Sequence, residues 1–500
     1  MSEQNLKPSV YGSYFQASQL LDEIEAIDFF LAKKLLNSIE THIDEQNKLN
    51  ANEAVQLFHV FIALSQSQRL GHSCLPIALI ARQQWFSIEH GDTQDNKHLN
   101  EEDVVKGFEF ADADFIKCII EKSISCTQGL VVFELDSLYL HRYWQFEQQV
   151  SNALHAKFKE TANYDSDFIK KVIEQLFPEN LQVDASSNKV DWQKIAVANA
   201  LNKTFSIIAG GPGTGKTYTV TKLLAGLLML NPNAEIVMVA PTGKAAQRLS
   251  ESIVKAKQGF IEQGLVEREL IEKIPDSAST IHRLLGVVRN SPNFKHDIGN
   301  LLSCDVLLID EVSMVDLAMM ARVFRALKEN TSVILLGDAD QLPSVATGSV
   351  LADLAPWQET LYSNENSRYI KHVTNTDLTK VELNESSQAI KTIDYLTYLV
   401  ESRRFSGEGG IGKLAKLVIK GDAINAWNIL TDGKDNELTY VGNESLSTYI
   451  SKLALLHYKD IARSKDINEA FKLFDKFRIL APTRQGEYGL EAINTMVEAQ

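Results

Sequence analysis

The clearest chemistry in the sequence lies in one glycine-rich stretch, Gly210–Thr217, which reads GGPGTGKT. It fits G-x-x-x-x-G-K-[ST], a pattern typical of loops that hold the phosphates of a nucleotide. Backbone N–H groups in such a loop, and the dipole of the helix behind it, favour anions. We expect Lys216 to reach the β- and γ-phosphates of ATP and the Thr217 hydroxyl to hold Mg²⁺. The predicted nucleotide-binding residues of the loop are Gly210, Gly211, Pro212, Gly213, Thr214, Gly215, Lys216 and Thr217.

Two carboxylates follow the apolar run Val306–Ile309. We expect Asp310 to hold Mg²⁺ through water and Glu311 to act as the general base that polarises the attacking water. An Asp-Glu pair alone is weak support, but at the end of a buried strand downstream of a phosphate-binding loop it is strong. Gln341, in GDADQLP, is a candidate sensor of the γ-phosphate because its amide can bond both phosphate and water. The alternative for Gln341 is an ordinary loop residue.

A third set of polar residues suits contact with a nucleic-acid backbone. APTGKAA contributes Thr242 and Lys244, and STIHRLL contributes Thr280 and His282. Hydroxyl, ammonium and imidazole groups commonly contact phosphates. Separately, Gln193 lies on a short helical stretch before the glycine-rich loop, where its amide could contact the adenine edge. A solvent-facing glutamine is an equally good interpretation of that position.

These motifs follow apolar segments that predict a parallel α/β sheet. The candidate strands, with helical stretches between them, are Phe205–Ala209, Ile236–Ala240, Val306–Ile309 and Val333–Leu336. Ligands of such sheets bind at the carboxyl ends of the strands, so the motifs should converge on one crevice.

The regions on either side of this sheet have different patterns. Before it, Ile24–Leu35 and Val55–Leu64 predict helices, and residues 131–140 predict a strand or hairpin. The aromatic cluster 141–150 could stack on bases, but packing against a neighbouring element is favoured. After the sheet, Leu438–Val441 and Arg478–Ala481 are candidate strands.

Composition narrows the class of protein. The 500 residues carry a net charge of −15, which argues against a generally basic nucleic-acid coat. Residues 1–190 hold 28 acidic and 16 basic side chains, so their net charge is −12 and that of the remainder is −3. The acidic excess of residues 1–190 therefore favours a protein partner for this part of the chain, although a need for solubility explains the excess equally well. Four scattered cysteines and the absence of a signal-peptide pattern indicate a cytoplasmic location. No apolar run approaches the ~20 residues of a membrane span, so no membrane association is expected.

The motifs together resemble superfamily 1 DNA helicases of the 5′→3′ branch. GGPGTGKT, APTGKAAQRL, STIHRLLG, LLIDEVSMVD and GDADQLPSVATGSV occur in the order of that branch. Within it, the chain is similar to the D subunits of RecBCD-type helicase–nucleases (exodeoxyribonuclease V). RLGHSC, LYLHRYWQFEQQV, DWQKIA, ESRRFSGEGGIGKLA and LAPTRQGEYGL extend the resemblance over nearly the whole chain.

The resemblance implies an α/β P-loop NTPase with two RecA-like parallel-sheet domains and ATP in the cleft between them. It also implies a heterotrimer with RecB- and RecC-type subunits and a single-stranded DNA end as substrate. Arg404 aligns with the family's fourth motif, whose arginine reaches the γ-phosphate. The family usually has an aromatic residue at the position of Arg403, so the choice between these neighbours stays open.

We therefore expect a helical, partner-docking N-terminal domain over 1–125, a connecting segment over 126–190, a first RecA-like domain over 191–355 and a second over 356–500. In the family, a His-Lys-Ser-Gln-Gly-type motif and a Thr-Arg motif follow LAPTRQGEYGL. Neither occurs before Gln500, so the second domain is expected to be incomplete. The predicted function is an ATP-dependent 5′→3′ DNA helicase subunit acting in double-strand break repair and homologous recombination. Two alternatives are an ATP-binding assembly module without motor output and a stand-alone superfamily 1 helicase.

Overall fold

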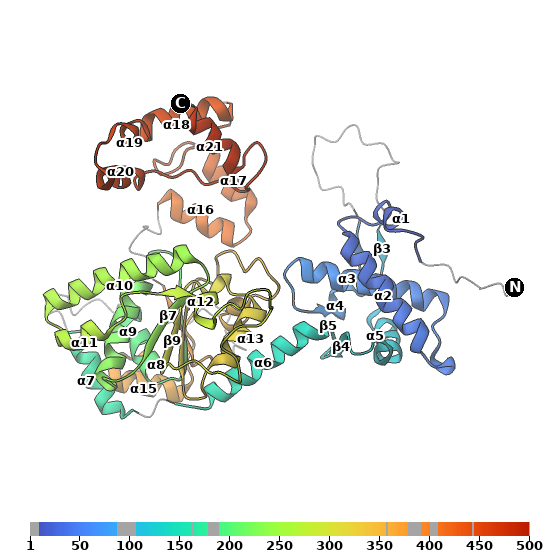
Figure 1. The fold of residues 1–500 in the computed structure, drawn as a ribbon, viewed down its shortest axis with the longest axis horizontal. Helices are drawn as coiled ribbons and strands as arrows, with labels where there is room; N and C mark the ends of the chain where they lie inside the picture. The colour runs from blue at the N-terminus through green and yellow to red at the C-terminus, as the bar shows by residue number, and fades with distance from the viewer. Residues whose placement is uncertain are drawn as a thin grey trace. The chain divides into compact units, whose positions relative to one another are not determined.

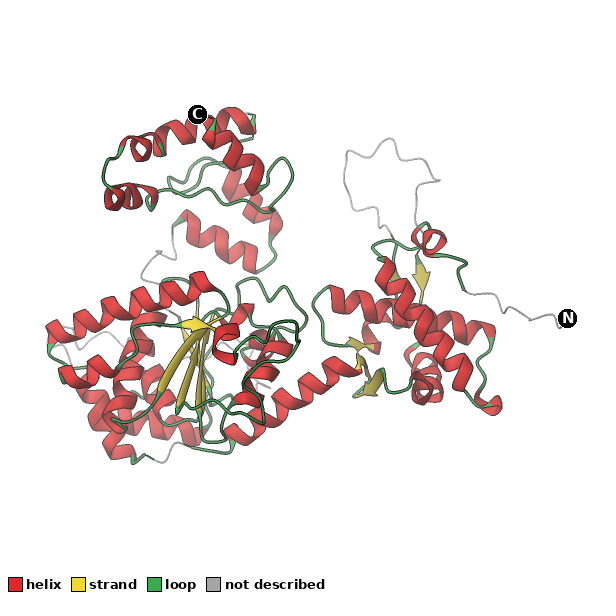
Figure 2. Cartoon of the chain, in the orientation of Figure 1, coloured by secondary structure: helices red, strands yellow, loops and turns green. Residues whose placement is uncertain are grey.

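The computed structural model describes residues 10–87, 107–161, 164–178, 190–356, 359–378, 392–400, 409–442 and 445–499. The chain divides into two compact units, Met1–Arg404 and Phe405–Gln500. Helices predominate in both, and the main sheet belongs to the first (Figure 2). Within these described ranges, no helix combines the length and the hydropathy needed to cross a bilayer.

The first unit is built around a six-stranded sheet whose strands are all parallel (Figure 1). Its strands are β6 (Phe205–Gly210), β7 (Ile236–Ala240), β8 (Ser279–Thr280), β9 (Val306–Ile309), β10 (Ser332–Gly337) and β11 (Leu396–Leu399). They lie in the order β11-β6-β10-β9-β7-β8. The predicted parallel sheet is therefore confirmed, and all four predicted strands belong to it.

The sixth strand comes from beyond the boundary that the sequence suggested. β11 pairs with β6, placing Leu396 opposite Ile207 and Leu399 opposite Gly210. The sheet consequently continues past residue 355, where the first RecA-like domain was expected to end. Leu396, Tyr398 and Leu399 are all buried, so the sheet and its cores extend to this segment.

Helices cover both faces of the sheet and divide its side chains between two cores. Neighbouring residues on one strand alternate, so that Ile208 lies in one core and Ile207 in the other. The core containing Ile208 is formed with α7 (Ser166–Leu176), α8 (Trp192–Leu201), α9 (Lys216–Leu230), α10 (Gly243–Gln263), α11 (Arg268–Lys273) and α15 (Asn364–Thr374). The core containing Ile207 is formed with α6 (His141–Phe158), α12 (Ile281–Leu285), η4 (Val312–Met314), α13 (Leu317–Ala326) and α14 (Val350–Leu354).

The N-terminal part of the first unit is mostly helical, with three short β pairings. Its elements are α1 (Tyr14–Ser18), α2 (Ala26–His42), η1 (Glu45–Asn47), α3 (Ala51–Arg69), β1 (Leu75–Pro76), α4 (Ile77–Ile80), β2 (Gln84–Trp85), β3 (Phe108–Glu109), α5 (Ala113–Ser123), η3 (Ile124–Thr127), β4 (Val131–Glu134) and β5 (Ser137–Leu140). Both predicted helices are present. On α2, however, Ile27 is exposed and Phe29 is buried. One core runs from Ala17 to Leu138, so this domain continues past residue 125 into the hairpin.

The hairpin formed by β4 and β5 leads directly into α6. Leu135 and Asp136 both have positive φ, as in the tight turns that match strand twist. On α6, the indole of Trp144 donates to Glu134 Oε2 at 2.7 Å, and Phe146 packs against the core containing Ile207. The aromatic cluster thus contacts its own neighbours, as the packing interpretation predicted.

The second unit contains the helices α16 (Gly410–Ile419), α17 (Ala423–Thr431), α18 (Leu446–His457), α19 (Lys459–Arg463), α20 (Ile467–Phe474) and α21 (Leu490–Glu498). The two candidate strands, Leu438–Val441 and Arg478–Ala481, were wrong, because neither is a strand in the structure. Tyr440 and Leu480 are exposed. A parallel strand requires paired neighbours and buried faces, and these segments have neither among the described residues of the unit. The sheet expected for a second RecA-like domain is not formed in this part of the described chain.

Candidate nucleotide and DNA site

The glycine-rich loop joins the buried strand β6 to the start of α9. Gly213 and Gly215 have φ of 81° and 82°, a backbone conformation that other residues rarely adopt. Gly210 is confined as well, since an added Cβ would lie 2.9 Å from the Leu399 carbonyl oxygen. The loop therefore requires glycine both for its turns and for its close approach to β11.

Lys216 is folded back over the loop that it belongs to. Its ammonium group donates to the carbonyl oxygens of Gly210 and, at 3.1 Å, of Gly211. Thr214 Oγ1 also donates to Gly211 O, at 2.9 Å. The lysine charge is thus held at the loop, where an incoming phosphate would compete with these carbonyls for it. Thr217, the predicted Mg²⁺ ligand, lies in the first turn of α9 and is half-buried.

Gln193 contacts the loop itself. Its amide Nε2 donates to Thr214 O at 3.0 Å, and it lies 2.3 Å from the position of a Cβ on Gly215. Neither of the two sequence interpretations anticipated this contact. The side chain ties α8 to the phosphate-binding loop, and the adenine role stays a prediction.

Asp310 and Glu311 end β9 in an unusual local geometry. The Asp310 N–H donates to Val239 O, and the Glu311 N–H donates to Asp310 Oδ1, both at 2.9 Å. Glu311 has φ 53° and ψ 44°, a left-handed conformation that is uncommon for glutamate. Burial, followed by the nearby Glu311 carboxylate, raises the pKa of Asp310 to about 6, while Lys216 acts in the opposite direction. A buried carboxylate of this kind is poised to accept a cation.

Gln341 is held by an aspartate that the sequence interpretation did not include in the site. Asp338 is buried at the end of β10. Its Oδ2 accepts from Gln341 Nε2 at 3.3 Å, and its Oδ1 accepts from the Asp340 N–H at 3.1 Å. Tyr398 of β11 donates to Asp340 Oδ2 at 3.4 Å. The sequence feature that could have identified Asp338 as a site residue is its position directly after a buried strand.

Two of the four predicted DNA-contacting residues are helix N-caps. Thr242 Oγ1 accepts from Ala245 N at the start of α10, and Thr280 Oγ1 accepts from Arg283 N at the start of α12, both at 3.2 Å. Ala240 and Thr280 are paired in register, so the two caps lie at the ends of neighbouring strands. Lys244 and His282 lie one turn or less further along and are exposed.

The sheet order therefore separates the predicted residues into two neighbouring groups. Lys216, Asp310 and Gln341 follow β6, β9 and β10, which are adjacent in the sheet. Thr242 follows β7, and Thr280 is the last residue of β8, the edge strand beyond β7. Arg403 and Arg404 lie outside the described residues.

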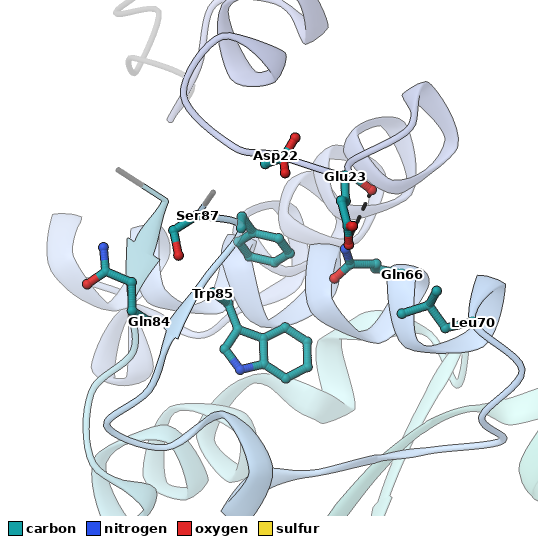
Figure 3. A pocket seen from close by; sticks show the side chains of 8 residues that line it. Asp22, Glu23, Gln66, Leu70, Gln84, Trp85 and Ser87 are labelled. Carbon is teal, nitrogen blue, oxygen red and sulfur yellow. Dashed lines mark hydrogen bonds between the residues drawn. The ribbon is translucent and has the colours of Figure 1, made fainter. Parts of the chain in front are cut away.

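A pocket of about 390 Å³ lies in the N-terminal domain, away from these motifs (Figure 3). Asp22 and Glu23 stand on one side of it, and the Trp85 ring lies across from them. Gln66 Nε2 donates to the Glu23 carbonyl oxygen at 3.5 Å. The lining therefore combines two carboxylates with an indole ring.

The chain is similar to several known proteins. Residues 193–347 match the AAA domain family. The chain is 39% identical to the RecBCD enzyme subunit RecD of Haemophilus influenzae over 73% of its length and 59% of that protein. It is 26% identical to RecD of Buchnera aphidicola subsp. Schizaphis graminum over 94% of its length and 76% of that protein. Among solved structures, it is similar to a Pif1 helicase from Candida albicans, with 14% identity, a TM-score of 0.28 and 56% of each chain covered. The chain spans about 60% of the length of several of the RecD proteins it matches.

Proposed function

We propose, from its similarity to the RecD subunits of RecBCD enzymes, that the chain is the ATP-driven 5′→3′ DNA helicase subunit of a RecBCD-type helicase–nuclease. Such a complex acts in double-strand break repair and homologous recombination. Because the proposed substrate is chromosomal DNA, we expect the protein to act in the cytoplasm. The observation that carries the proposal is the grouping of Lys216, Asp310 and Gln341 at the ends of three adjacent strands.

Nucleotide chemistry at this place follows from the side chains around the loop. Turned backbone N–H groups and the start of α9 favour the phosphates of ATP. Lys216 leaves the Gly210 and Gly211 carbonyls to contact the β- and γ-phosphates. Glu311 polarises the attacking water. Gln341 contacts the γ-phosphate through its amide and so makes the loop that follows β10 sensitive to the bound nucleotide. Arg404, as the arginine of the family's fourth motif, would contact the γ-phosphate.

Mg²⁺ fits the residues at this site. The raised pKa of Asp310 means that its anion is poorly stabilised by the protein alone, so a nearby cation is favoured. Asp310, through water, and the Thr217 hydroxyl would hold the ion, and both offer the oxygen ligands that Mg²⁺ prefers. When bound, the ion would neutralise charge on the phosphate oxygens.

Single-stranded DNA would lie along the ends of β7 and β8. Thr242 and Thr280 use their oxygens as helix caps, which leaves each hydroxyl hydrogen available to a phosphate oxygen. The start of α10, a long helix, also favours phosphate. Lys244 and His282 add exposed contacts on the same edge.

RecB- and RecC-type subunits are the proposed partners. The acidic front of the chain, with a net charge of −12 over residues 1–190, suits a basic protein surface. Within it, the pocket lined by Asp22, Glu23 and Trp85 offers carboxylates and an aromatic face to a cationic side chain. Co-purification with such partners, lost on reversing Asp22 and Glu23 to lysine, would support this part of the proposal.

The central test is DNA-stimulated ATP hydrolysis by the full-length protein. Lys216→Gln should lower the rate by two or more powers of ten, because a charge on the transferred phosphates is lost. Lys194→Gln, on α8 outside the loop, is the matched control and should be nearly neutral. Hydrolysis that survives Lys216→Gln would overturn the proposal. Nucleotide binding without hydrolysis in the wild type would favour the assembly module instead.

A further inference from the structure

The loop that follows β10 is held at both ends, and side chains in its middle are exposed to solvent. At its start, the Asp338 carboxylate holds Gln341 Nε2 and the Asp340 N–H. In the middle, Leu342 and Val345 are 87% and 101% exposed. At its end, Thr347 is buried. The position of Gln341 therefore depends on how firmly the two ends are held.

The far end of this loop is held by the N-terminal domain. Thr347 Oγ1 donates to Gln68 O at 3.0 Å, and the Gly348 N–H donates to Gly71 O at 2.8 Å. Both acceptors lie in the turn that ends α3, where Gly71 has φ 99°. The Gly348 carbonyl in turn accepts from Leu317 N, at the start of α13, at 3.1 Å. Two main-chain carbonyls of one domain thus fix a loop of the other.

Hydrogen bonds rather than tight packing define this contact. A cavity of about 480 Å³ lies beside it, lined in part by Ser73, Leu317 and Gly348. The side-chain amide nitrogen of Gln68 is buried and has no hydrogen-bond partner among the described residues. Because the cavity leaves few atoms packed around this contact, neighbouring side chains should not compensate for the loss of one of its hydrogen bonds.

We propose that the end of α3 positions the Gln341 loop for ATP hydrolysis, with Thr347 as the positioning residue. This inference rests on the proposed function of the nucleotide site. It makes the N-terminal domain part of the hydrolytic machinery, so that a partner bound to that domain would alter the rate of hydrolysis through α3. Since Thr347 does not touch the nucleotide, it should affect turnover and leave nucleotide affinity unchanged.

The test compares three substitutions in the full-length protein. Thr347→Val removes the donor at nearly constant volume and should lower kcat by up to about tenfold, the value of one hydrogen bond, with KM for ATP changed less than about twofold. Thr347→Ser keeps the donor and should restore kcat. Thr127→Val is the matched control, since Thr127 is also buried and donates to Ile124 O at 2.7 Å within the N-terminal domain.

The outcomes separate the inference from the function that it rests on. A Thr347→Val protein with wild-type kcat, or a serine variant as slow as the valine variant, would overturn the inference while Lys216→Gln still abolishes hydrolysis. A wild-type protein without ATP hydrolysis would instead overturn the proposed function. If Thr347→Val lowers the melting temperature more than Thr127→Val does, Thr347→Ala is used as the test variant instead. A lower kcat with an unchanged KM for ATP again supports the inference, and an unchanged kcat overturns it.

Discussion

The Glu311 N–H donates to the carboxylate of Asp310, its own neighbour, from a left-handed backbone conformation. Holding glutamate in that conformation costs about 1–3 kcal/mol, so the surrounding structure must impose it. The same turn ends β9 and begins η4. At this turn, burial raises the pKa of the Asp310 carboxyl to about 6.

Asp310→Asn should stabilise the nucleotide-free protein at pH 8. The folded state keeps its proton up to about pH 6, whereas the unfolded chain releases it near 3.8, so stability falls as pH rises across that interval. Removing the charge should raise the free energy of unfolding by up to about 3 kcal/mol at pH 8 and by almost nothing at pH 3.5. Chemical denaturation at the two pH values measures this difference. A variant less stable than the wild type at pH 8 would contradict it, and ATP hydrolysis should be lost in either case.

Gln193→Ala should weaken nucleotide binding through the loop. The substitution removes the bond from Gln193 Nε2 to Thr214 O and leaves the glycine-rich turn without its tie to α8. We expect KM for ATP to rise roughly five- to tenfold, as for the loss of one such bond. Gln175→Ala is the matched control, because Gln175 Nε2 donates to Leu265 O at 2.9 Å elsewhere in the same unit. An equal rise in KM for ATP with the two substitutions would contradict a specific role of Gln193 in holding the phosphate-binding loop.

Lys244→Ala should reduce the salt dependence of binding to single-stranded DNA. Each phosphate neutralised by the protein contributes a slope of about 0.7 in a plot of log affinity against log salt concentration. Loss of Lys244 should lower the slope by about that amount. Lys255→Ala, exposed further along α10, should leave it unchanged. An unaltered slope for Lys244→Ala would place this side chain off the DNA path.

The N-terminal domain should lose stability as pH falls below about 6.5. His59 is buried, accepts from the Tyr11 hydroxyl at 2.8 Å through Nε2 and donates to Val55 O at 2.7 Å through Nδ1. Burial lowers the pKa of His59 to about 4, so the unfolded chain binds more protons between pH 4 and 6.5. The loss should approach about 3 kcal/mol at pH 4. His59→Gln should be less stable at pH 7 and flatter in its pH dependence, and an unchanged dependence would exclude His59 as the cause.

Much of the main sheet and its loops could be predicted from the sequence because their signals are local. Strand, glycine turn and helix follow one another around Lys216, and the apolar run before Asp310 is continuous. What the sequence did not indicate depends on distant partners. The hydrogen bonds from Gln193 to Thr214 and from Thr347 to Gln68 each join segments that only the folded chain brings together. The burial of Asp338 likewise depends on the elements packed around the end of β10. β11 was missed for the same reason, since Leu396–Leu399 is short and its pairing partner lies far earlier in the chain.

The placement of β11 also bears on the order in which the chain folds during synthesis. β6, which carries the phosphate-binding loop, lies between β10 and β11. Until the ribosome has made Leu396–Leu399, β6 is an edge strand whose backbone groups on one side are open to pairing with other chains. Contacts between segments so far apart also form slowly, because a long loop must close first. The strand that carries the phosphate-binding loop is thus the last inner strand of the sheet to gain both of its neighbours.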